Sequence, residues 1–170
     1  MTSLETKSDA DIDQWIANHE RAGKTRAPLF QELIVERNRR HGKGLDIGTS
    51  IAAMTRSARE SRYISYGDLA ASNGMTWSKA RPLMSGKHSH MDDLLAYCHS
   101  HEMPLLPSIV VGRDHLDSGE MDEDTIDGFV AGIRRLGVSV SEPVEFLKKC
   151  QSECFEWAAK QPDVIDTVEE

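Results

Sequence analysis

The segment 63–84 carries side chains suited to contacting nucleic acid. Its pattern predicts two short helices joined by a tight turn at Asn73-Gly74, which is the outline of a helix-turn-helix. Ser65 is a suitable N-cap for the first helix, and Thr76 occupies the same position before the second. Aromatic rings stack on bases and cations bind phosphates. We therefore take five residues of this segment as DNA-binding candidates: Tyr66, Thr76, Trp77, Lys79 and Arg81.

A second group of candidates is basic and lies before this segment. Residues 21–62 contain ten Lys or Arg and four acidic residues, a balance of +6, although the whole chain carries a formal net charge of -8. Phosphate contacts from such cations dominate DNA affinity and make it salt-dependent. We expect backbone contacts from Arg37, Arg39, Arg40 and Lys43. The alternative is that the charged regions are ordinary solvated faces.

Residues 114–170 carry the opposite net charge. They contain five Lys or Arg and fifteen acidic residues, a balance of -10. This region supports an alternative function as a small acidic protein-interaction module or inhibitor. A phage-encoded protein that acts on a bacterial nucleic-acid-targeting defence enzyme is one example, because an acidic surface can occupy a basic DNA channel. Residues 117–127 and the last helix would then be the sensitive positions, in place of Arg81 and 37–40.

Other chemistries fit the residues less well. The motifs His88-x-His90 and Cys98-His99-x-His101 contain residue types that bind zinc. They lack the spacing between two ligand pairs that a zinc finger has. The acidic run 117–127 lacks the ligand pattern of an EF-hand, and acids before a helix complement its dipole. We find neither Gly-x-Ser-x-Gly nor a phosphate-binding Gly-rich loop. We therefore expect no enzymatic activity, no catalytic residue, no metal and no cofactor.

Helical periodicity dominates the rest of the chain, and the only clear strand signal is Ser108-Ile-Val-Val111. The fold class expected is mainly α (α+β): a helical domain around a helix-turn-helix or winged-helix-like core, with a short β element near 108–111. Pro82 suggests that the second helix of the helix-turn-helix ends or kinks near Arg81. The expected organisation is a disordered tail (1–10), N-terminal helices (11–62), the winged-helix-like core (63–113), an acidic helical region packed on that core (114–162) and a loose tail (163–170).

Cysteine usage and hydropathy bear on the compartment. The three cysteines do not form a disulfide framework, no apolar run approaches a membrane span, and the N-terminus lacks a signal-peptide pattern. We expect a cytoplasmic protein that does not engage a membrane.

The last helix carries cysteine and aromatic side chains that pack either in the core, which we favour, or at a dimer interface. These residues are Cys150, Cys154, Phe155 and Trp157.

The segment 63–111 resembles the DNA-binding domain of the alkylguanine-DNA alkyltransferases and their alkyltransferase-like relatives. The resemblance rests on Ser65-Tyr66-Gly67-Asp68-Leu69-Ala70, on Ala80-Arg81 with Met84, and on Pro107 leading into Val110-Val111. It implies a helix-turn-helix that enters the minor groove. It also implies that Tyr66 helps to rotate a target nucleotide and that Arg81 fills the gap left by the flipped base.

The reactive motif of that family, Pro-Cys-His-Arg-Val, is replaced here by Pro107-Ser108-Ile109-Val110-Val111. Alkyl transfer to sulfur requires an activated thiolate, so this chain should not perform that reaction. The function expected from the sequence is therefore that of a non-enzymatic DNA-binding protein with an alkyltransferase-like winged helix.

Overall fold

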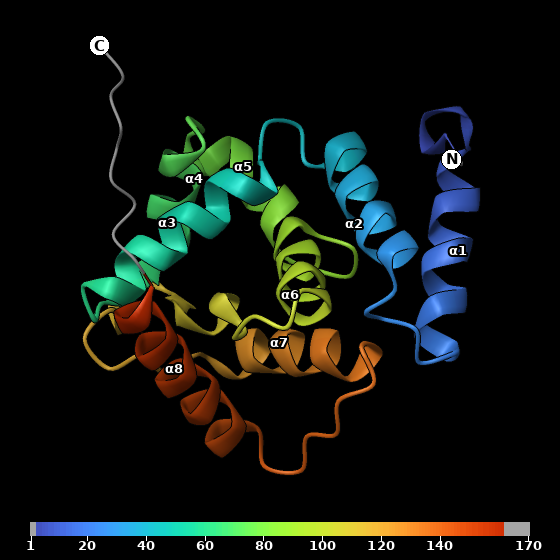
Figure 1. The fold of residues 1–170 in the computed structure, drawn as a ribbon. Coiled ribbons are helices and arrows are strands. Elements are labelled where there is room, and N and C mark those ends of the chain that lie inside the picture. The colour runs from blue at the N-terminus through green and yellow to red at the C-terminus, as the bar shows by residue number, and fades with distance from the viewer. Residues whose placement is uncertain (1–2, 162–170) are drawn as a thin grey trace.

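The computed structural model describes residues 3–161, which form a mainly helical fold with one small sheet (Figure 1). The expected fold class, mainly α with a short β element, is confirmed. The elements are, in chain order, η1 (Leu4–Thr6), α1 (Asp9–Arg21), α2 (Pro28–His41), α3 (Ile47–Arg59), β1 (Ile64–Ser65), α4 (Tyr66–Ser72), α5 (Trp77–Met84), α6 (His90–Ser100), η2 (Leu106–Ile109), β2 (Val110–Val111), η3 (Arg113–His115), α7 (Glu123–Arg135) and α8 (Pro143–Lys160).

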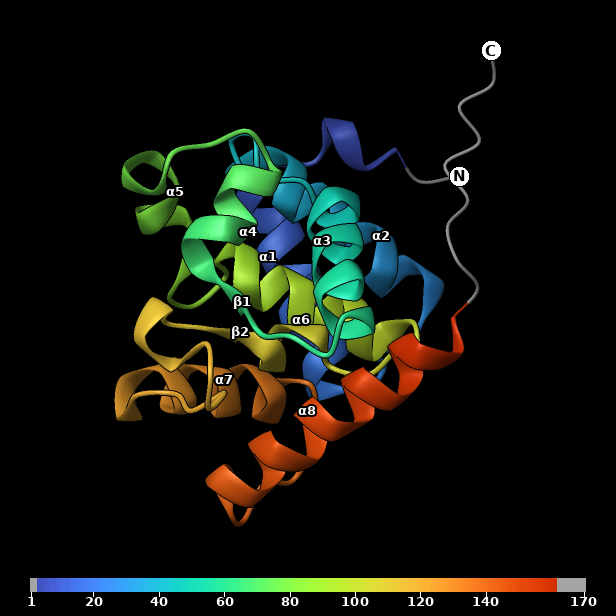
Figure 2. The same ribbon diagram turned by 90° about the vertical axis from the view of Figure 1, so that its left-hand side faces the viewer.

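Helix α6 lies at the centre and packs against α2, α3, α5, α7 and η2 (Figure 1). Helix α1 covers the outer side of α2, while α8 packs against α3, α7 and η2. The core side chains of α6, Leu94 and Cys98, have no exposed surface, and Phe30 and Leu33 of α2 are equally buried. Turned by 90°, the molecule shows α5 at the upper left and α8 at the bottom, next to α7 (Figure 2). Helix α5 therefore lies away from α8.

The sheet joins two segments that are far apart in sequence. Strand β1 pairs in parallel with β2, with Ile64 opposite Val110 and Ser65 opposite Val111. Parallel strands need a long crossover connection, which α4, α5 and α6 provide. As a result, α4 lies next to β2, and Tyr66 at its start lines the same cavity as Pro107 of η2.

Local signals account for most helix ends. Pro28 and Pro143 occupy first-turn positions, where a missing N–H costs no hydrogen bond. Asp46 caps α3, its side chain accepting a hydrogen bond from the Thr49 amide. The expected strand 108–111 is partly wrong, because Leu106–Ile109 is a 3-10 helix and only Val110–Val111 is extended. Proline fixes φ in the helical range, and Pro107 lies in the first turn of η2.

Residues 3–10 differ from the disordered tail that the sequence suggests. They form η1 and the first turn of α1, whose N-cap Ser8 accepts a hydrogen bond from the Asp11 amide. The Leu4 carbonyl accepts a hydrogen bond of 2.8 Å from Arg40 of α2. A long-range partner of this kind cannot be read from local composition. The expected loose tail, 163–170, lies outside the described residues.

The cysteine and aromatic set of α8 belongs to the core. Cys150 and Cys154 are buried, and Phe155 and Trp157 pack against the same cluster. The Phe155 ring meets Tyr63 edge-on, with ring centroids 5.4 Å apart. Over the part of the chain that the structure describes, no helix is long and apolar enough to cross a membrane.

Candidate nucleic-acid interface

The turn between α4 and α5 is held by its own residues and by α3. The Ser65 hydroxyl accepts a hydrogen bond from the Asp68 amide, which caps α4. Gly74 adopts a φ of 72°, which glycine reaches without strain. The Asn73 side chain accepts from the Asp46 amide at 2.9 Å and donates to Ser50 Oγ at 3.0 Å. The helix-turn-helix is therefore anchored to α3 through Asn73.

A buried hydrogen-bond chain continues from Ser50 into the centre of the molecule. His90 Nδ1 lies 2.7 Å from Asn38 Oδ1, and its Nε2 lies 2.8 Å from Ser50 Oγ. Asn38 Nδ2 donates to the Leu45 carbonyl, so Asn38 Oδ1 accepts from His90. His90 thus carries its proton on Nδ1, and Ser50 donates to Nε2. Burial lowers the pKa of His90 to about 4, which keeps the ring neutral near pH 7.

Three of the predicted residues line one hollow. Tyr66, Trp77 and Arg81 border a cavity of about 650 Å³ that also reaches α6 and α7. Trp77 and Arg81 are four residues apart on α5 and therefore lie on the same face. The ring centroids of Tyr66 and Trp77 are 6.1 Å apart. The sequence predicted these residues individually, and the structure brings them together.

The hollow combines an apolar lining with charged side chains at its edge. Met84, Met91, Leu95 and Phe129 supply apolar surface. The charged lining residues are Arg81, Lys87, Asp92, Asp124 and Arg135. Arg135 forms an ion pair with Asp92, so these two charges compensate each other. Lys87 and the residues of α7 were not predicted as site residues, because only the tertiary fold places them opposite α5.

Tyr66 and Trp77 differ in exposure. Burial raises the pKa of the Tyr66 hydroxyl to about 12. Trp77 is 41% exposed, and it is one of three large apolar side chains in residues 3–161 that are classed as exposed. The Trp77 ring therefore offers accessible aromatic surface at the hollow.

Thr76 and Lys79 are exposed on the same helix-turn-helix, but neither lines the hollow. Thr76 occupies the N-cap position of α5, as expected, but its side chain makes no capping hydrogen bond. Pro82 lies inside α5, which runs to Met84, so of the two alternatives at Arg81, a helix end or a kink, the helix end is wrong.

The basic residues of α2 are largely neutralised within the fold. Arg37 is only 4% exposed, and its Nε and Nη2 lie 2.8 Å and 2.7 Å from Asp93 Oδ1. Arg39 and Arg40 both bind Glu36, and hydrogen bonding from Arg39 is the largest cause that lowers the pKa of Glu36 to about 2. The expectation that Arg37 and Arg40 present a basic surface is therefore wrong.

Lys43 differs from its neighbours. It is exposed, adopts a φ of 48° and has no ion-pair partner within the described residues. Arg39 also keeps an exposed side chain, at 61%, although it binds Glu36. The spacing of Glu36 to Arg39 and Arg40 is a helical pairing visible in the sequence. The Arg37 partner is 56 residues away and carries no local signal.

Ser108, which the proposed resemblance would align with the reactive cysteine of the alkyltransferases, is closed off from solvent. Ser108 has no exposed surface, and its hydroxyl lies 3.5 Å from Cys154 Sγ. Burial raises the pKa of the Cys154 thiol to about 12, which keeps it protonated. Pro107, by contrast, lines the hollow together with Tyr66 and Arg81. Four of the residues that carry the resemblance thus line the cavity (Tyr66, Arg81, Met84 and Pro107), and position 108 presents no nucleophile to it.

The histidines that suggested a metal site have separate partners. His99 Nε2 lies 2.9 Å from Thr25 Oγ1, and the His101 ring stacks on Tyr97 at 4.0 Å. Within residues 3–161, no group of three or more His, Cys, Asp or Glu side chains is arranged to hold a metal ion.

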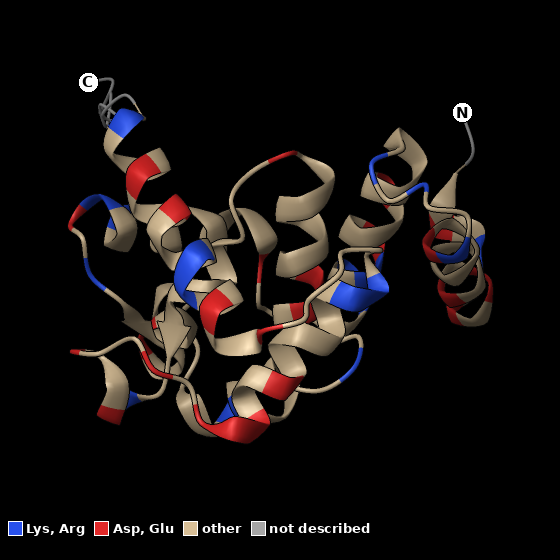
Figure 3. Cartoon of the chain, turned by 90° about the horizontal axis from the view of Figure 1, so that it is seen from below, with Lys and Arg blue, Asp and Glu red and all other residues tan. Residues whose placement is uncertain are grey.

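Charges of both signs occur over the surface. The helix that leads to the C-terminus, α8, carries basic and acidic segments in alternation (Figure 3). The acids of the loop before α7 are mostly exposed, and His115 lies 3.0 Å from Asp122.

Models of protein families, curated proteins and solved structures were compared with the chain, and none of them matches it.

Proposed function

We propose that this chain is a non-enzymatic DNA-binding protein whose hollow accepts an unpaired or extruded nucleobase. The observation that carries the proposal is the convergence of Tyr66, Trp77 and Arg81 on one cavity of about 650 Å³. Cavities of roughly 300–1,000 Å³ are typical of small-molecule sites, so a nucleobase is within range.

The lining suits a flat, partly polar ring. Base–aromatic stacking on an exposed ring such as Trp77 contributes about 1–3 kcal/mol and tolerates different bases. The apolar side chains Met91 and Leu95 favour the ring faces over water. Arg81 has a planar cationic group that stacks on bases and binds phosphates. Trp77 and Arg81 together therefore offer both base and backbone contacts.

Backbone contacts are assigned to exposed cations near the helix-turn-helix. Lys79 and Arg81 are exposed on α5, and Lys43 is exposed in the loop before α3. Each neutralised phosphate releases counterions, which makes binding salt-dependent. These few cations support moderate affinity despite the net charge of -8. The unpaired, buried state of Cys98, Cys150 and Cys154 fits the cytoplasm.

One observation favours protein interaction as a second candidate function. The loop and helix start between 114 and 127 expose most of their acidic side chains, and in the described part of the chain only Asp122 has an ion-pair partner there, His115. An acidic surface of this kind can meet a basic partner. Under this alternative, Arg81 would be irrelevant to binding.

The test is fluorescence anisotropy of a labelled duplex with one unpaired thymine, at about 50 and about 200 mM salt. We expect salt-dependent binding that Arg81→Ala weakens and Lys148→Ala does not. Both variants remove one exposed charge, but Lys148 lies on α8, away from α5 (Figure 2). Absence of binding at low salt would reject the DNA proposal and favour the acidic surface.

A further inference from the structure

Hydrogen bonds join the turn of the helix-turn-helix, α3, α6 and α2 in one closed ring. The ring closes because the Asp46 N–H and the Leu45 carbonyl belong to one planar peptide group, which donates on one side and accepts on the other. All the hydrogen bonds of the ring are between 2.7 and 3.0 Å long. The members, in the order in which each donates to the next, are the Leu45–Asp46 peptide group, Asn73, Ser50, His90 and Asn38.

The donor sense is the same around the whole ring. The peptide N–H donates to Asn73 Oδ1, and Asn73 Nδ2 donates to Ser50 Oγ. The Ser50 hydroxyl donates in turn to His90 Nε2, and His90 Nδ1–H donates to Asn38 Oδ1. Asn38 Nδ2 then donates to the carbonyl of the peptide group. Because every hydrogen bond runs in one sense, each polarises the next, and the ring behaves as a unit.

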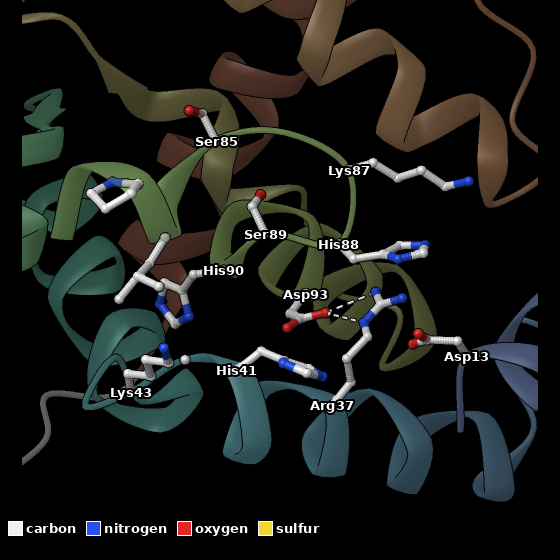
Figure 4. Close-up of a pocket in the computed structure, with 13 residues that line it drawn as sticks. Asp13, Arg37, His41, Lys43, Ser85, Lys87, His88, Ser89, His90 and Asp93 are labelled. Atoms are coloured by element: carbon white, nitrogen blue, oxygen red, sulfur yellow. Dashed lines mark hydrogen bonds and ion pairs between the residues drawn. The ribbon is translucent and has the colours of Figure 1, made fainter. Parts of the chain in front are cut away.

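Three side chains of the ring lie inside the fold. Ser50, His90 and Asn38 are all classed as buried. In the close-up, the His90 ring lies on the side of Lys43, whereas Asp93 holds Arg37 further along α6 (Figure 4). The ring is therefore separate from the Arg37–Asp93 ion pair. A buried polar group that loses its partner has a higher free energy, so a change at one member affects its neighbours.

The ring connects two walls of the hollow. Asn73 lies in the turn between α4 and α5, and its amide also donates to the Leu69 carbonyl of α4 at 3.0 Å. The first residue of α5, Trp77, lines the hollow. Met91 follows His90 in α6 and lines it too. The position of the turn relative to α6, and with it the position of Trp77 relative to Met91, is thus tied to this ring.

We propose that Ser50 and His90 are positioning residues for DNA binding. Neither side chain lines the hollow, and both act through Asn73, which holds the turn against α3. The DNA ligand in this inference rests on the proposed function, whereas the placement of Trp77 is a property of the chain itself. Breaking the link between His90, Ser50 and Asn73 releases the turn on one side and displaces the aromatic surface that stacks on a base.

Two substitutions of His90 break the ring on opposite sides. The asparagine amide is as far from the backbone as Nδ1, so His90→Asn keeps a donor for Asn38 and loses the acceptor for Ser50. The glutamine amide is as far from the backbone as Nε2, so His90→Gln keeps the acceptor for Ser50 and loses the donor to Asn38. We expect the duplex with an unpaired thymine to bind about tenfold more weakly to His90→Asn and about twofold more weakly at most to His90→Gln. A merely structural role would weaken binding equally in both.

A matched pair of hydroxyl substitutions tests Ser50. The Thr25 hydroxyl is buried and lies 2.9 Å from His99 Nε2, also on α6, but it joins the loop before α2 instead of the helix-turn-helix. Ser50→Ala and Thr25→Val each remove one buried hydroxyl that contacts a histidine of α6. We expect Ser50→Ala to weaken duplex binding about tenfold and Thr25→Val to leave it unchanged.

The placement of Trp77 is measured without DNA, from the indole N–H signals in the NMR spectrum of the full chain. Ser50→Ala and His90→Asn should shift the Trp77 signal, while the signal of Trp157 on α8 serves as the internal reference. Thr25→Val should leave the Trp77 signal in place. Near-ultraviolet circular dichroism identifies the variants that fold. If His90→Asn does not fold, the comparison of Ser50→Ala with Thr25→Val decides.

The outcomes separate the positioning from the proposed function. A Trp77 signal that stays in place in the folded Ser50→Ala and His90→Asn variants overturns the positioning. A shifted signal with unchanged duplex affinity overturns its role in binding, as does equal weakening by Ser50→Ala and Thr25→Val. A wild-type chain that binds no duplex contradicts the proposed function instead, and the Trp77 signal then decides the positioning alone.

Discussion

Tyr66 begins α4 and Trp77 begins α5, and their ring centroids lie 6.1 Å apart with the planes inclined by 39°. Tyr66 is the more buried partner, so its ring gives Trp77 a fixed neighbour on one side. Trp77 keeps 41% of its surface exposed at the hollow. The relationship between the two rings thus provides an aromatic surface that is both positioned and accessible, which is what stacking on a base requires.

Replacing Trp77 with alanine tests this surface. We expect the duplex with an unpaired thymine to bind about 5- to 150-fold more weakly, because one base–aromatic stack contributes about 1–3 kcal/mol. Anisotropy measures the affinity. Val144 is 56% exposed on α8, so Val144→Ala is a matched control for the loss of an exposed apolar side chain. Equal weakening by both variants would contradict a specific role for Trp77.

The salt dependence of binding distinguishes Lys79 from Arg40. Lys79→Ala should reduce the slope of log affinity against log salt by about 0.9, since one phosphate contact is lost. Arg40→Ala should leave the slope unchanged, because Arg40 is held by Glu36 and Asp9. Anisotropy over several salt concentrations gives both slopes. A reduced slope for Arg40→Ala would show that this arginine reaches DNA after all.

The buried pair of Arg37 and Asp93 should be structural. Asp93→Ala leaves a guanidinium buried without its partner, and we expect a loss of about 3–5 kcal/mol in the free energy of unfolding. The double variant Arg37→Met with Asp93→Leu should recover most of that loss, since the burial of charge disappears. Urea unfolding measures both. A double variant as unstable as Asp93→Ala would contradict this explanation.

His90 predicts a pH dependence of stability. Its pKa is lowered to about 4 in the folded chain, below the ordinary value of 6.5. The unfolded chain therefore binds the proton more readily, so the stabilisation is complete above pH 6.5 and is lost as the pH falls towards 4. A difference of this size corresponds to about 3 kcal/mol.

Urea unfolding of wild type and His90→Gln between pH 4 and 7 measures this effect. Other groups, including Asp93, titrate in the same range, and the difference between the two proteins isolates His90. We expect the variant to be less stable at pH 7 and the difference to shrink as the pH falls. A difference that stays constant with pH would contradict a neutral, buried His90.

Local signals in the sequence predicted much of the fold. Pro28, Asp46 and Pro143 mark helix starts through backbone and capping chemistry that acts within a few residues. The partner of Val110–Val111 could not be predicted, because Ile64–Ser65 is short and precedes three intervening helices. The ordering of residues 3–10 likewise depends on Arg40, a residue of another helix.

The candidate site was predictable only in part. The spacing of Trp77 and Arg81 places them on one face of a helix, and the turn at Asn73-Gly74 brings Tyr66 close. The opposite wall comes from α6 and α7, whose placement follows from core packing. The prediction for Arg37 was wrong. Because Arg37 lies in a basic run, it was expected on the surface, but it is buried. Its burial depends on Asp93, a long-range partner.

The most direct test of the central claim is NMR of methionine methyl groups. Met84, Met91 and Met121 line the hollow, whereas Met54 and Met103 pack elsewhere in the core. A base inserted in the hollow shifts nearby methyl signals through its ring current. With saturating duplex that contains an unpaired thymine, we predict shifts at the three hollow methionines and none at Met54 or Met103, and smaller shifts with a fully paired duplex. Saturated binding that leaves Met84, Met91 and Met121 unshifted would contradict the account.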